Sequence, residues 1–268
     1  MANEKFEEYY LKLYGEHWEN LRKSLLEERP AFSFSQGLKT PYFLDYASVL
    51  AALSLRLPES ASAKEQQPET PVILDACAAP GGKSLVIAAS LPQGVLLLSN
   101  ELSNERRRRL SDVLDKHLDC EKRKQVKVSG FDAAAQGRRK SEHGRYSAIL
   151  LDAPCSSESH VLKDKNALDE WTPARPAFLA RRQWALLSSA FLLLAPGGSL
   201  VYSTCAITTV ENDGVIEKLI EKYGDEVKPD PPDFTEGEKT KYGRIILPDN
   251  GGLGPLYVAR FRKIRNEE

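Results

Sequence analysis

The stretch Asp75-Ala-Cys-Ala-Ala-Pro-Gly-Gly-Lys-Ser84 decides the fold, and it follows an apolar run at 72–74. Small residues directly after a short apolar run predict a strand that turns sharply into a helix. The two glycines let a ligand approach the backbone, and the free amide groups at the helix start can hold a carboxylate. The stretch matches neither G-x-x-x-x-G-K-S nor G-x-G-x-x-G, which argues against ATP and NAD as ligands.

Outward from this turn, apolar runs alternate with helix-like segments. The expected strands are 72–74, 95–98, 126–128, 146–151 and 200–203, and the expected helices are 83–91, 103–118, 178–194 and 211–223. This βαβ order predicts a mainly parallel sheet with helices on both faces. Two last runs, 244–247 and 256–261, have no helix between them, so we expect an antiparallel hairpin at the edge of a seven-stranded α/β sheet.

The residues before this region differ from it in pattern. Apolar residues recur three and four apart at 4–26 and again at 44–57, which predicts a small helical N-terminal region at 1–57. Between Pro58 and Pro71 no apolar residue is larger than alanine, so we expect 58–71 to be an exposed linker. The main domain is then expected at 72–268.

Composition excludes several classes of protein. The chain has 37 Lys+Arg, 38 Asp+Glu and 41% hydrophobic residues, which excludes disordered, collagen-like and disulfide-dense chains. No apolar run approaches the ~20 residues of a membrane span, and the acidic start lacks the order of a signal peptide. We therefore expect a cytoplasmic protein with no membrane partner. The four cysteines show no Cys-x-x-Cys pair and no His at ligand spacing, so no metal is expected.

Acidic residues stand at the carboxyl ends of the expected strands, where open α/β sheets bind ligands. Glu101 follows the glycines by about twenty residues, where a carboxylate can accept hydrogen bonds from both ribose hydroxyls. This position indicates an adenosyl ligand. Asp132 is then available for the adenine amino group and Asp152 for the reaction centre. The alternative is that each acid merely caps a helix.

Two cysteines also follow expected strands, Cys155 in D-A-P-C and Cys205 in S-T-C. A free cysteine is often only a small buried hydrophobe. Two of them on neighbouring strand ends beside an adenosyl site indicate chemistry instead, because a thiolate is a strong nucleophile. We expect Cys77, within the turn, and Cys120, at a helix end, to be structural.

The motifs D-A-C-A-A-P-G-G-K-S, N-E at 100–101, D-A-P-C-S-S and Y-S-T-C-A together resemble those of the Sun-family (Nop/Sun) RNA cytosine-5 methyltransferases. The likeness runs from the linker to the C-terminus. It implies a Rossmann-like fold that uses S-adenosylmethionine. The compact branch with the mitochondrial ribosomal-RNA and tRNA enzymes is most similar, on S-S-E-S-H after Cys155 and on Tyr10, Trp18, Arg22 and Leu26.

The resemblance implies a role for each matched position. Glu101 would bind the ribose, Asp132 the adenine, and Arg106 would steady the pocket. Cys205 would add to carbon 6 of cytosine, Cys155 would assist release, and Asp152 would border the cofactor and hold the ring-nitrogen edge of the base. The methionine part of the cofactor would be wrapped by Cys77, Ala78, Ala79, Pro80, Gly81, Gly82 and Lys83.

The implied product is 5-methylcytosine in RNA, with ribosomal RNA or a ribosomal particle as first substrate and tRNA as second. Residues 1–57 are too short for the RNA-binding module of many relatives, so we expect RNA to be held by the catalytic face itself, by an accessory RNA-binding protein, or inside a partly assembled ribosomal particle. The family commonly has Ser or Thr after the nucleophile, where this chain has Ala206. Two alternatives stay open: a DNA cytosine-5 methyltransferase that attacks through Cys155, and an RNA-binding assembly factor with little turnover.

Overall fold

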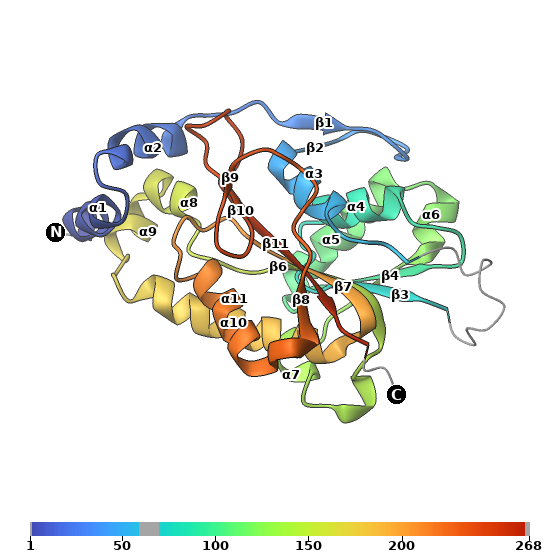
Figure 1. Ribbon diagram of the computed structural model, residues 1–268. Helices are drawn as coiled ribbons and strands as arrows, with labels where there is room; N and C mark the ends of the chain where they lie inside the picture. Colours follow the sequence, from blue (N-terminus) through green and yellow to red (C-terminus); the bar gives the residue numbers. More distant parts are fainter. Residues whose placement is uncertain (1, 59–69, 266–268) are drawn as a thin grey trace.

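A mixed sheet runs through the middle of the molecule (Figure 1). The computed structural model describes residues 2–58 and 70–265, and within these ranges the sheet has nine strands. Its parallel part has the order β5-β4-β3-β6-β7. The order reverses between β3 and β6, so the carboxyl ends of these two strands border the crevice where such sheets bind ligands. The parallel strands are β3 (Val72–Asp75), β4 (Leu96–Asn100), β5 (Val126–Ser129), β6 (Tyr146–Asp152) and β7 (Leu194–Thr204).

The C-terminal strands extend the sheet in antiparallel fashion, and the predicted hairpin is confirmed. Strand β11 (Leu256–Lys263) pairs with both β7 and β10 (Arg244–Ile246). Two short strands were not predicted: β9 (Glu238–Lys239) pairs with β10, and β8 (Val227–Pro229) pairs with the end of β11. Such short strands have too few side chains to show an alternating pattern, so the predicted number of seven was too low.

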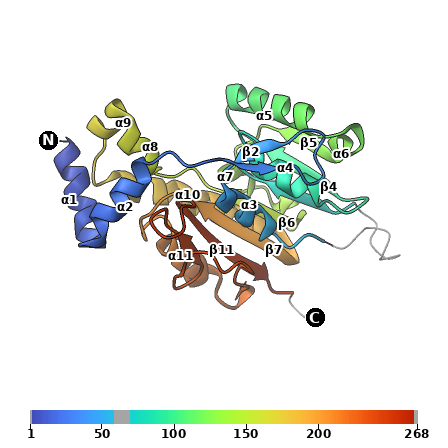
Figure 2. The same ribbon diagram turned by 90° about the horizontal axis from the view of Figure 1, so that it is seen from above.

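Helices cover both faces of the sheet (Figure 2). One face packs against α3 (Tyr46–Leu53), α4 (Gly82–Ala89) and α5 (Asn104–His117), with α6 (Cys120–Gln125) beside α4. The other packs against α7 (Ala133–Gln136), α10 (Arg175–Leu193) and α11 (Asp213–Tyr223). Ile73 belongs to the first core and Leu74 to the second, because successive strand side chains point to opposite faces. The strands are therefore continuously apolar in sequence.

An aromatic cluster fixes the first two helices, α1 (Ala2–Tyr14) and α2 (His17–Leu26). Tyr10 stacks on Trp18 with ring centroids 5.0 Å apart, and Phe6 meets Trp171 edge-on at 5.0 Å. The partners of these two helices are α8 (Glu158–Lys163) and α9 (Lys165–Asp169), which were not predicted. The hairpin of β1 (Phe32–Phe34) and β2 (Tyr42–Leu44) was also not predicted, and it leads into α3.

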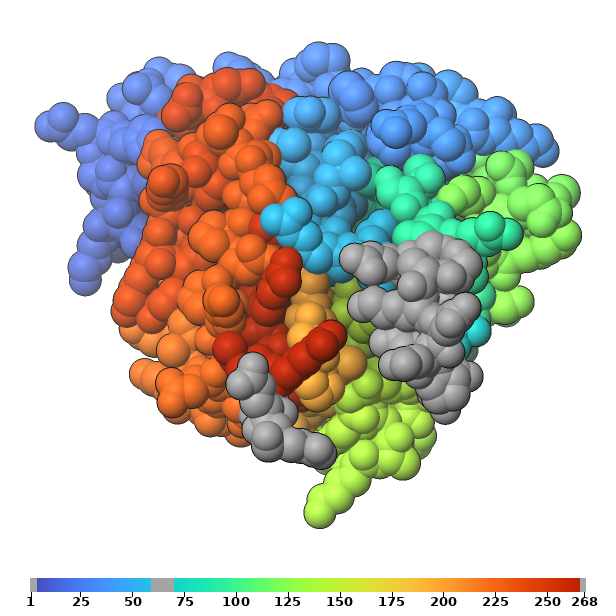
Figure 3. Space-filling view, turned by 45° about the vertical axis from the view of Figure 1, so that its right-hand side comes forward, coloured from blue at the N-terminus to red at the C-terminus, as the bar shows by residue number. Residues whose placement is uncertain are grey.

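Helix α3 shares the core of the sheet, since its Leu50 and Ala51 are buried in the same cluster as Ile87 of α4. Figure 3 shows the blue N-terminal segments lying against both the teal segments after residue 70 and the red C-terminal segments. Most of the predicted linker at 58–71 lies outside the described residues. The division into 1–57, 58–71 and 72–268 therefore stays a prediction.

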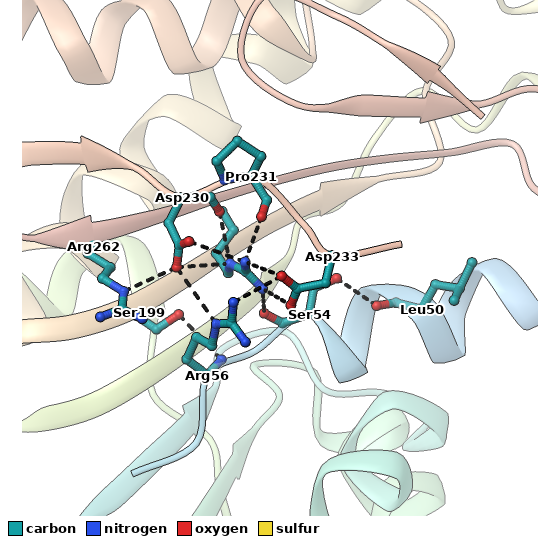
Figure 4. Close-up of polar contacts among 9 residues, drawn as sticks. Leu50, Ser54, Arg56, Ser199, Asp230, Pro231, Asp233 and Arg262 are labelled. Atoms are coloured by element: carbon teal, nitrogen blue, oxygen red, sulfur yellow. Dashed lines mark hydrogen bonds and ion pairs between the residues drawn. The ribbon is translucent and has the colours of Figure 1, made fainter. Parts of the chain in front are cut away.

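One buried arginine joins the end of α3 to the C-terminal strands (Figure 4). Arg260 of β11 is only 1% exposed, and its Nη1 donates to the Ser54 carbonyl at 2.9 Å and to Asp233 Oδ2 at 3.0 Å. Its Nε lies 2.8 Å from the Asp230 carbonyl and 3.1 Å from Asp230 Oδ2, and its Nη2 donates to the Pro231 carbonyl at 2.6 Å. This guanidinium is thus the common partner of three backbone carbonyls and two carboxylates.

Replacing the buried guanidinium should destabilise the whole fold. In Arg260→Met, the carbonyls and carboxylates around it lose their donor, and we expect the free energy of unfolding to fall by about 3–5 kcal/mol in urea titration. The matched control is Arg262→Met, because Arg262 pairs with the same Asp230 from the surface and is 49% exposed. Its change should stay within about 1 kcal/mol. Equal losses in the two variants would contradict this assignment.

Candidate active site

A cleft opens at the carboxyl ends of β3, β4, β5 and β6. Its empty volume, including the part that is open to solvent, is about 900 Å³. The predicted acids Glu101, Asp132 and Asp152 line it, together with both predicted reactive cysteines, Cys155 and Cys205. These residues come from different strand ends and are far apart in the sequence. The strand order brings them to a single cleft, as expected for a sheet with this switch point.

The turn between β3 and α4 is braced by both neighbouring strands. The Ala76 amide donates to the Leu150 carbonyl at 2.9 Å, and the Ala78 amide donates to the Asn100 carbonyl at 2.8 Å. Gly81 directly precedes α4 as its N-cap residue and has φ 119°, in the region that favours glycine. A Cβ on Gly82 would lie 2.9 Å from a ring carbon of Tyr42. Conformation and packing therefore account for both glycines, and their contact with a ligand stays a prediction.

The residues of this turn line two adjoining pockets. Cys77 and Ala79 line both the main cleft and the smaller pocket beside it. The remaining ones, apart from Gly81, line the smaller pocket beside Tyr42 and Ser48: Ala78, Pro80, Gly82 and Lys83. The turn thus faces two directions, and only part of the stretch that was predicted to wrap the methionine moiety borders the main cleft.

Lys83 points toward the predicted reaction centre. Its Nζ lies 2.7 Å from Asp152 Oδ2 and donates to Ser48 Oγ at 3.2 Å. Burial alone would lower the pKa of this amine, but the adjacent Asp152 carboxylate raises it above its ordinary value. The other carboxylate oxygen of Asp152 accepts from Ser203 Oγ at 2.7 Å. The carboxylate at the end of β6 is therefore held from both sides.

The two acids predicted to bind the adenosyl group have different surroundings. Glu101 is 5% exposed, and its Oε1 accepts from the Ser103 amide at 2.9 Å while Oε2 lies 3.3 Å from Arg106 Nη1. Arg106 also donates to the Ala79 carbonyl at 3.0 Å, so it links Glu101 to the turn. Asp132 is exposed, and its Oδ1 caps α7 through the Ala134 amide at 3.0 Å. Asp132 thus caps a helix and lines the cleft as well.

The two reactive cysteines meet in the cleft as free thiols. Their Sγ atoms are 2.9 Å apart, and Cys205 Sγ lies 3.4 Å from Ser157 Oγ. The hydrogen bond from Cys155 lowers the pKa of Cys205 below its ordinary value, against the effect of burial. The same hydrogen bond, with burial, raises the pKa of Cys155 well above its ordinary value. The asymmetry favours Cys205 as thiolate and Cys155 as the thiol that donates to it.

The other two cysteines lack this environment. Burial raises the pKa of the Cys77 thiol to about 12, so it stays protonated at neutral pH. Cys120 is exposed and is the first residue of α6, where the Asp119 side chain caps the helix. Cys77 therefore lacks the lowered pKa that marks a nucleophile, and Cys120 is not among the residues that line the main cleft.

Sequence reasoning assigned no individual role to several site residues, although some lie within the quoted motifs. Ser48 holds Lys83 from outside those motifs, and Ser203, within Y-S-T-C-A, holds Asp152. Ser157 lies at the reactive thiol, and the buried acids Glu158 and Glu211 lie behind it. Their carboxylates look like surface charges in the sequence, and only the tertiary fold buries them.

The turn after Cys205 does not depend on a side chain at 206. Ala206 is fully buried, its amide donates to Thr204 Oγ1 at 3.2 Å, and its carbonyl accepts from Asn212 Nδ2 at 2.9 Å. Thr204 Oγ1 also donates to Asn212 Oδ1 at 2.6 Å. This side-chain pair holds the backbone around Cys205 without a hydroxyl at position 206.

Among residues 2–58 and 70–265, no three His, Cys, Asp or Glu side chains are grouped as metal ligands. In the same ranges, no helix has the length and apolar character to cross a membrane.

Comparison with known sequences identifies relatives. A sequence model of the family described as 16S rRNA methyltransferase RsmB/F matches residues 62–262. Ribosomal RNA small subunit methyltransferase F of Erwinia tasmaniensis is 38% identical over 197 residues, which are 72% of this chain and 40% of that protein. The protein of the same name from Aeromonas salmonicida is 41% identical over 163 residues, 61% of this chain and 33% of that protein. The chain thus spans 40% or less of the length of these two relatives.

Solved structures agree with the sequence comparison. The crystal structure of NSun6 from Pyrococcus horikoshii with SFG is 26% identical, with a TM-score of 0.68, and the match covers 87% of this chain and 55% of that one. A methyltransferase homolog protein from Pyrococcus horikoshii, 20% identical, has a TM-score of 0.72 and covers 97% of this chain and 94% of its own, which supports the fold. Because the family match extends over most of the chain and includes the β3–α4 turn and both cysteine motifs, this chain belongs to the RsmB/F family of 16S rRNA methyltransferases, and the predicted Sun-family resemblance is confirmed.

Proposed function

We propose that this chain forms 5-methylcytosine in RNA with S-adenosylmethionine as methyl donor. The observation that carries the proposal is the pair of thiols in one cleft, Cys205 with a lowered and Cys155 with a raised pKa, beside Asp152. Family membership and relatives named for ribosomal RNA of the small subunit favour ribosomal RNA as substrate, with tRNA second. A ribosomal particle, an accessory RNA-binding protein and a cytoplasmic location belong to the same proposal.

The main cleft fits an adenosyl ligand on its own geometry. Glu101 presents a buried carboxylate at the end of β4, and Asp132 lies at the end of the neighbouring β5, across the same wall. Carboxylates at these strand ends can accept hydrogen bonds from ribose hydroxyls and from an adenine amino group. Bound there, S-adenosylmethionine supplies an electrophilic methyl group. Support from a relative comes from NSun6, whose structure was solved with SFG.

Cytosine carbon 5 is a poor nucleophile, and Cys205 changes this. Its thiolate forms a bond to carbon 6, and the displaced electron pair moves through carbon 4 to ring nitrogen 3, which leaves carbon 5 enamine-like. A lone carboxylate at Asp152 would oppose negative charge on that nitrogen. Because Lys83 Nζ lies 2.7 Å from Asp152 Oδ2 and carries a proton, the Lys83–Asp152 pair stabilises the negative charge on the nitrogen instead. Such a base must leave any RNA helix to reach the cleft.

Release needs the second thiol. Once water in the solvent-open cleft has taken the proton from carbon 5, the electron pair of that C–H bond forms the double bond between carbons 5 and 6, and the electron pair of the carbon 6–sulfur bond returns to Cys205. The Cys155 thiol lies 2.9 Å from that sulfur and, with its raised pKa, still holds a proton that it can donate in a hydrogen bond to the departing thiolate. The same raised pKa argues against attack by Cys155, the route expected of a DNA cytosine-5 methyltransferase.

Replacing Cys205 by serine and replacing Cys155 by serine should have different effects on the reaction. In Cys205→Ser, we expect transfer of labelled methyl to unmethylated ribosomal RNA to fall at least about a hundredfold, because a hydroxyl is a far weaker nucleophile. In Cys155→Ser, a covalent protein–RNA adduct should accumulate on denaturing gels, because expulsion of Cys205 slows. If the adduct accumulated in Cys205→Ser instead, Cys155 would be the nucleophile and Cys205 the residue that assists release.

The same assay separates the remaining alternatives. A protein with little turnover, as expected of an assembly factor, would transfer no methyl group even in a single turnover with excess enzyme. Bisulfite sequencing of total RNA from cells with and without the gene then identifies both the RNA and the cytosine that is modified.

Loss of the Glu101 charge should weaken cofactor binding specifically. In Glu101→Gln, one acceptor position toward the ribose becomes a donor, and we expect the Kd for S-adenosylmethionine to rise about tenfold in calorimetry. The matched control is Glu105→Gln, four residues on and exposed, which should bind as the wild type does. Unchanged binding by Glu101→Gln would place the ribose elsewhere.

A further inference from the structure

Ser157 has an unusual backbone for its position. It precedes α8 with φ 54° and ψ 60°, and it is the one non-glycine residue with positive φ in the described part of the chain. This left-handed conformation costs an L residue free energy. A serine at a helix start ordinarily has an extended backbone and caps the helix through its hydroxyl. Ser157 differs in both respects: its backbone is left-handed, and its side chain forms no hydrogen bond that caps the helix.

The hydroxyl that does not cap the helix faces the reactive thiol instead. Ser157 Oγ lies 3.4 Å from Cys205 Sγ, and both residues line the main cleft. A thiolate in a cleft needs hydrogen-bond donors, because burial otherwise disfavours its charge. Cys155 is one donor, and the Ser157 hydroxyl has the right chemistry and position to be the second.

The left-handed turn is held by its neighbour, Ser156, which is fully buried. The Ser156 amide donates to Glu211 Oε2 at 2.9 Å, and its hydroxyl lies between Glu211 Oε1 and Glu158 Oε1. The Ser157 carbonyl accepts from the amides of His160 and Val161 at 2.9 and 3.0 Å. The backbone is thus fixed on both sides of Ser157.

Glu211 in turn is fixed from two other elements. Gln183 of α10 donates to its Oε2 at 2.8 Å, and Tyr202 of β7 donates to its carbonyl at 2.6 Å. Glu211 follows Cys205 in the loop after β7, whereas Ser156 follows Cys155 in the loop after β6. The carboxyl group of Glu211 therefore braces one cysteine loop against the other.

The number of hydrogens available around Ser156 indicates that Glu211 can hold the two cysteine loops together without a negative charge. One hydroxyl has one hydrogen, yet it lies close to two carboxyl oxygens, so one of the two acids must supply the other hydrogen. In agreement, burial raises the pKa of Glu158, and it raises that of Glu211 to about 7. A carboxamide, with one acceptor and one donor end, could replace Glu211 here.

We propose that Ser157 is a catalytic residue whose hydroxyl donates a hydrogen bond to the Cys205 thiolate, and that Ser156 and Glu211 are positioning residues that hold it there. The inference rests on the proposed role of Cys205 as nucleophile. Two variants separate the hydroxyl from the backbone: Ser157→Gly and Ser157→Ala both lose the hydroxyl, but only glycine relieves the left-handed conformation. A purely structural role predicts that glycine performs as well as serine or better.

The test is alkylation of Cys205 in the full chain by iodoacetamide across pH, with the modified cysteine identified by mass spectrometry. In both Ser157→Gly and Ser157→Ala, we expect the rate at Cys205 at neutral pH to fall about fivefold and the profile to move to higher pH. The control Ser35→Ala changes an exposed serine of another loop and should match the wild type. Charged groups that face Cys205, namely Asp152, Glu158 and Lys83, are the same in all three variants.

Each result decides the proposal. An unchanged Cys205 profile in both Ser157 variants, or a change in alanine alone, would overturn the role of the hydroxyl. For the positioning residue, Glu211→Gln should keep the wild-type profile and Glu211→Ala should shift it as Ser157→Ala does; equal shifts in both would overturn that assignment. The alkylation assay needs neither RNA nor methyl transfer, so it tests the role of Ser157 independently of the proposed function. The proposed role of Cys205 would be contradicted by a different result, namely full methyltransferase activity of Cys205→Ser.

Discussion

The parallel pairing of β6 with β7 sets the distance between the two reactive thiols. The register places Asp152 beside Ser203, and the Ala153 amide extends the ladder to the Ser203 carbonyl at 2.8 Å. Cys155 and Cys205 follow these paired residues by three and two positions, so they leave the sheet side by side. Because each thiol sets the pKa of the other, the chemical difference between them is a consequence of strand register.

The sheet positions the cofactor side of the cleft by the same means. Amides of the β3–α4 turn bind carbonyls of both flanking strands, so the turn cannot shift relative to the ends of β4 and β6. Lys83 lies one residue inside α4 and reaches across the switch point to Asp152. The turn and the end of β6 are therefore joined by an ion pair that is 14% exposed at Lys83 and 30% exposed at Asp152, where electrostatic interactions are stronger than between fully solvated charges.

The sequence predicted those parts of this arrangement that depend on local pattern. Short apolar segments identified the main strands, and the acids and cysteines after them all line the cleft: Cys77, Glu101, Asp132, Asp152, Cys155 and Cys205. It did not identify Ser157 or Glu211, because their roles depend on a backbone conformation and on burial that arise only when two distant loops pack together. The glycines at 81 and 82 were located correctly, but packing against α5 and Tyr42 explains them as well as a ligand would.

Burial of acidic side chains also changes the net charge that the protein carries at neutral pH. The formal net charge of −1 assumes that all 38 acids are ionised. Burial raises the pKa of Asp75 and of Glu211 to about 7, so at neutral pH these two groups hold part of their protons, and burial raises the pKa of Glu158 above its ordinary value as well. The real net charge is therefore less negative than the count. Arg108 and Arg109 on α5 are exposed, so the surface carries local positive charge that a net charge near zero does not reveal.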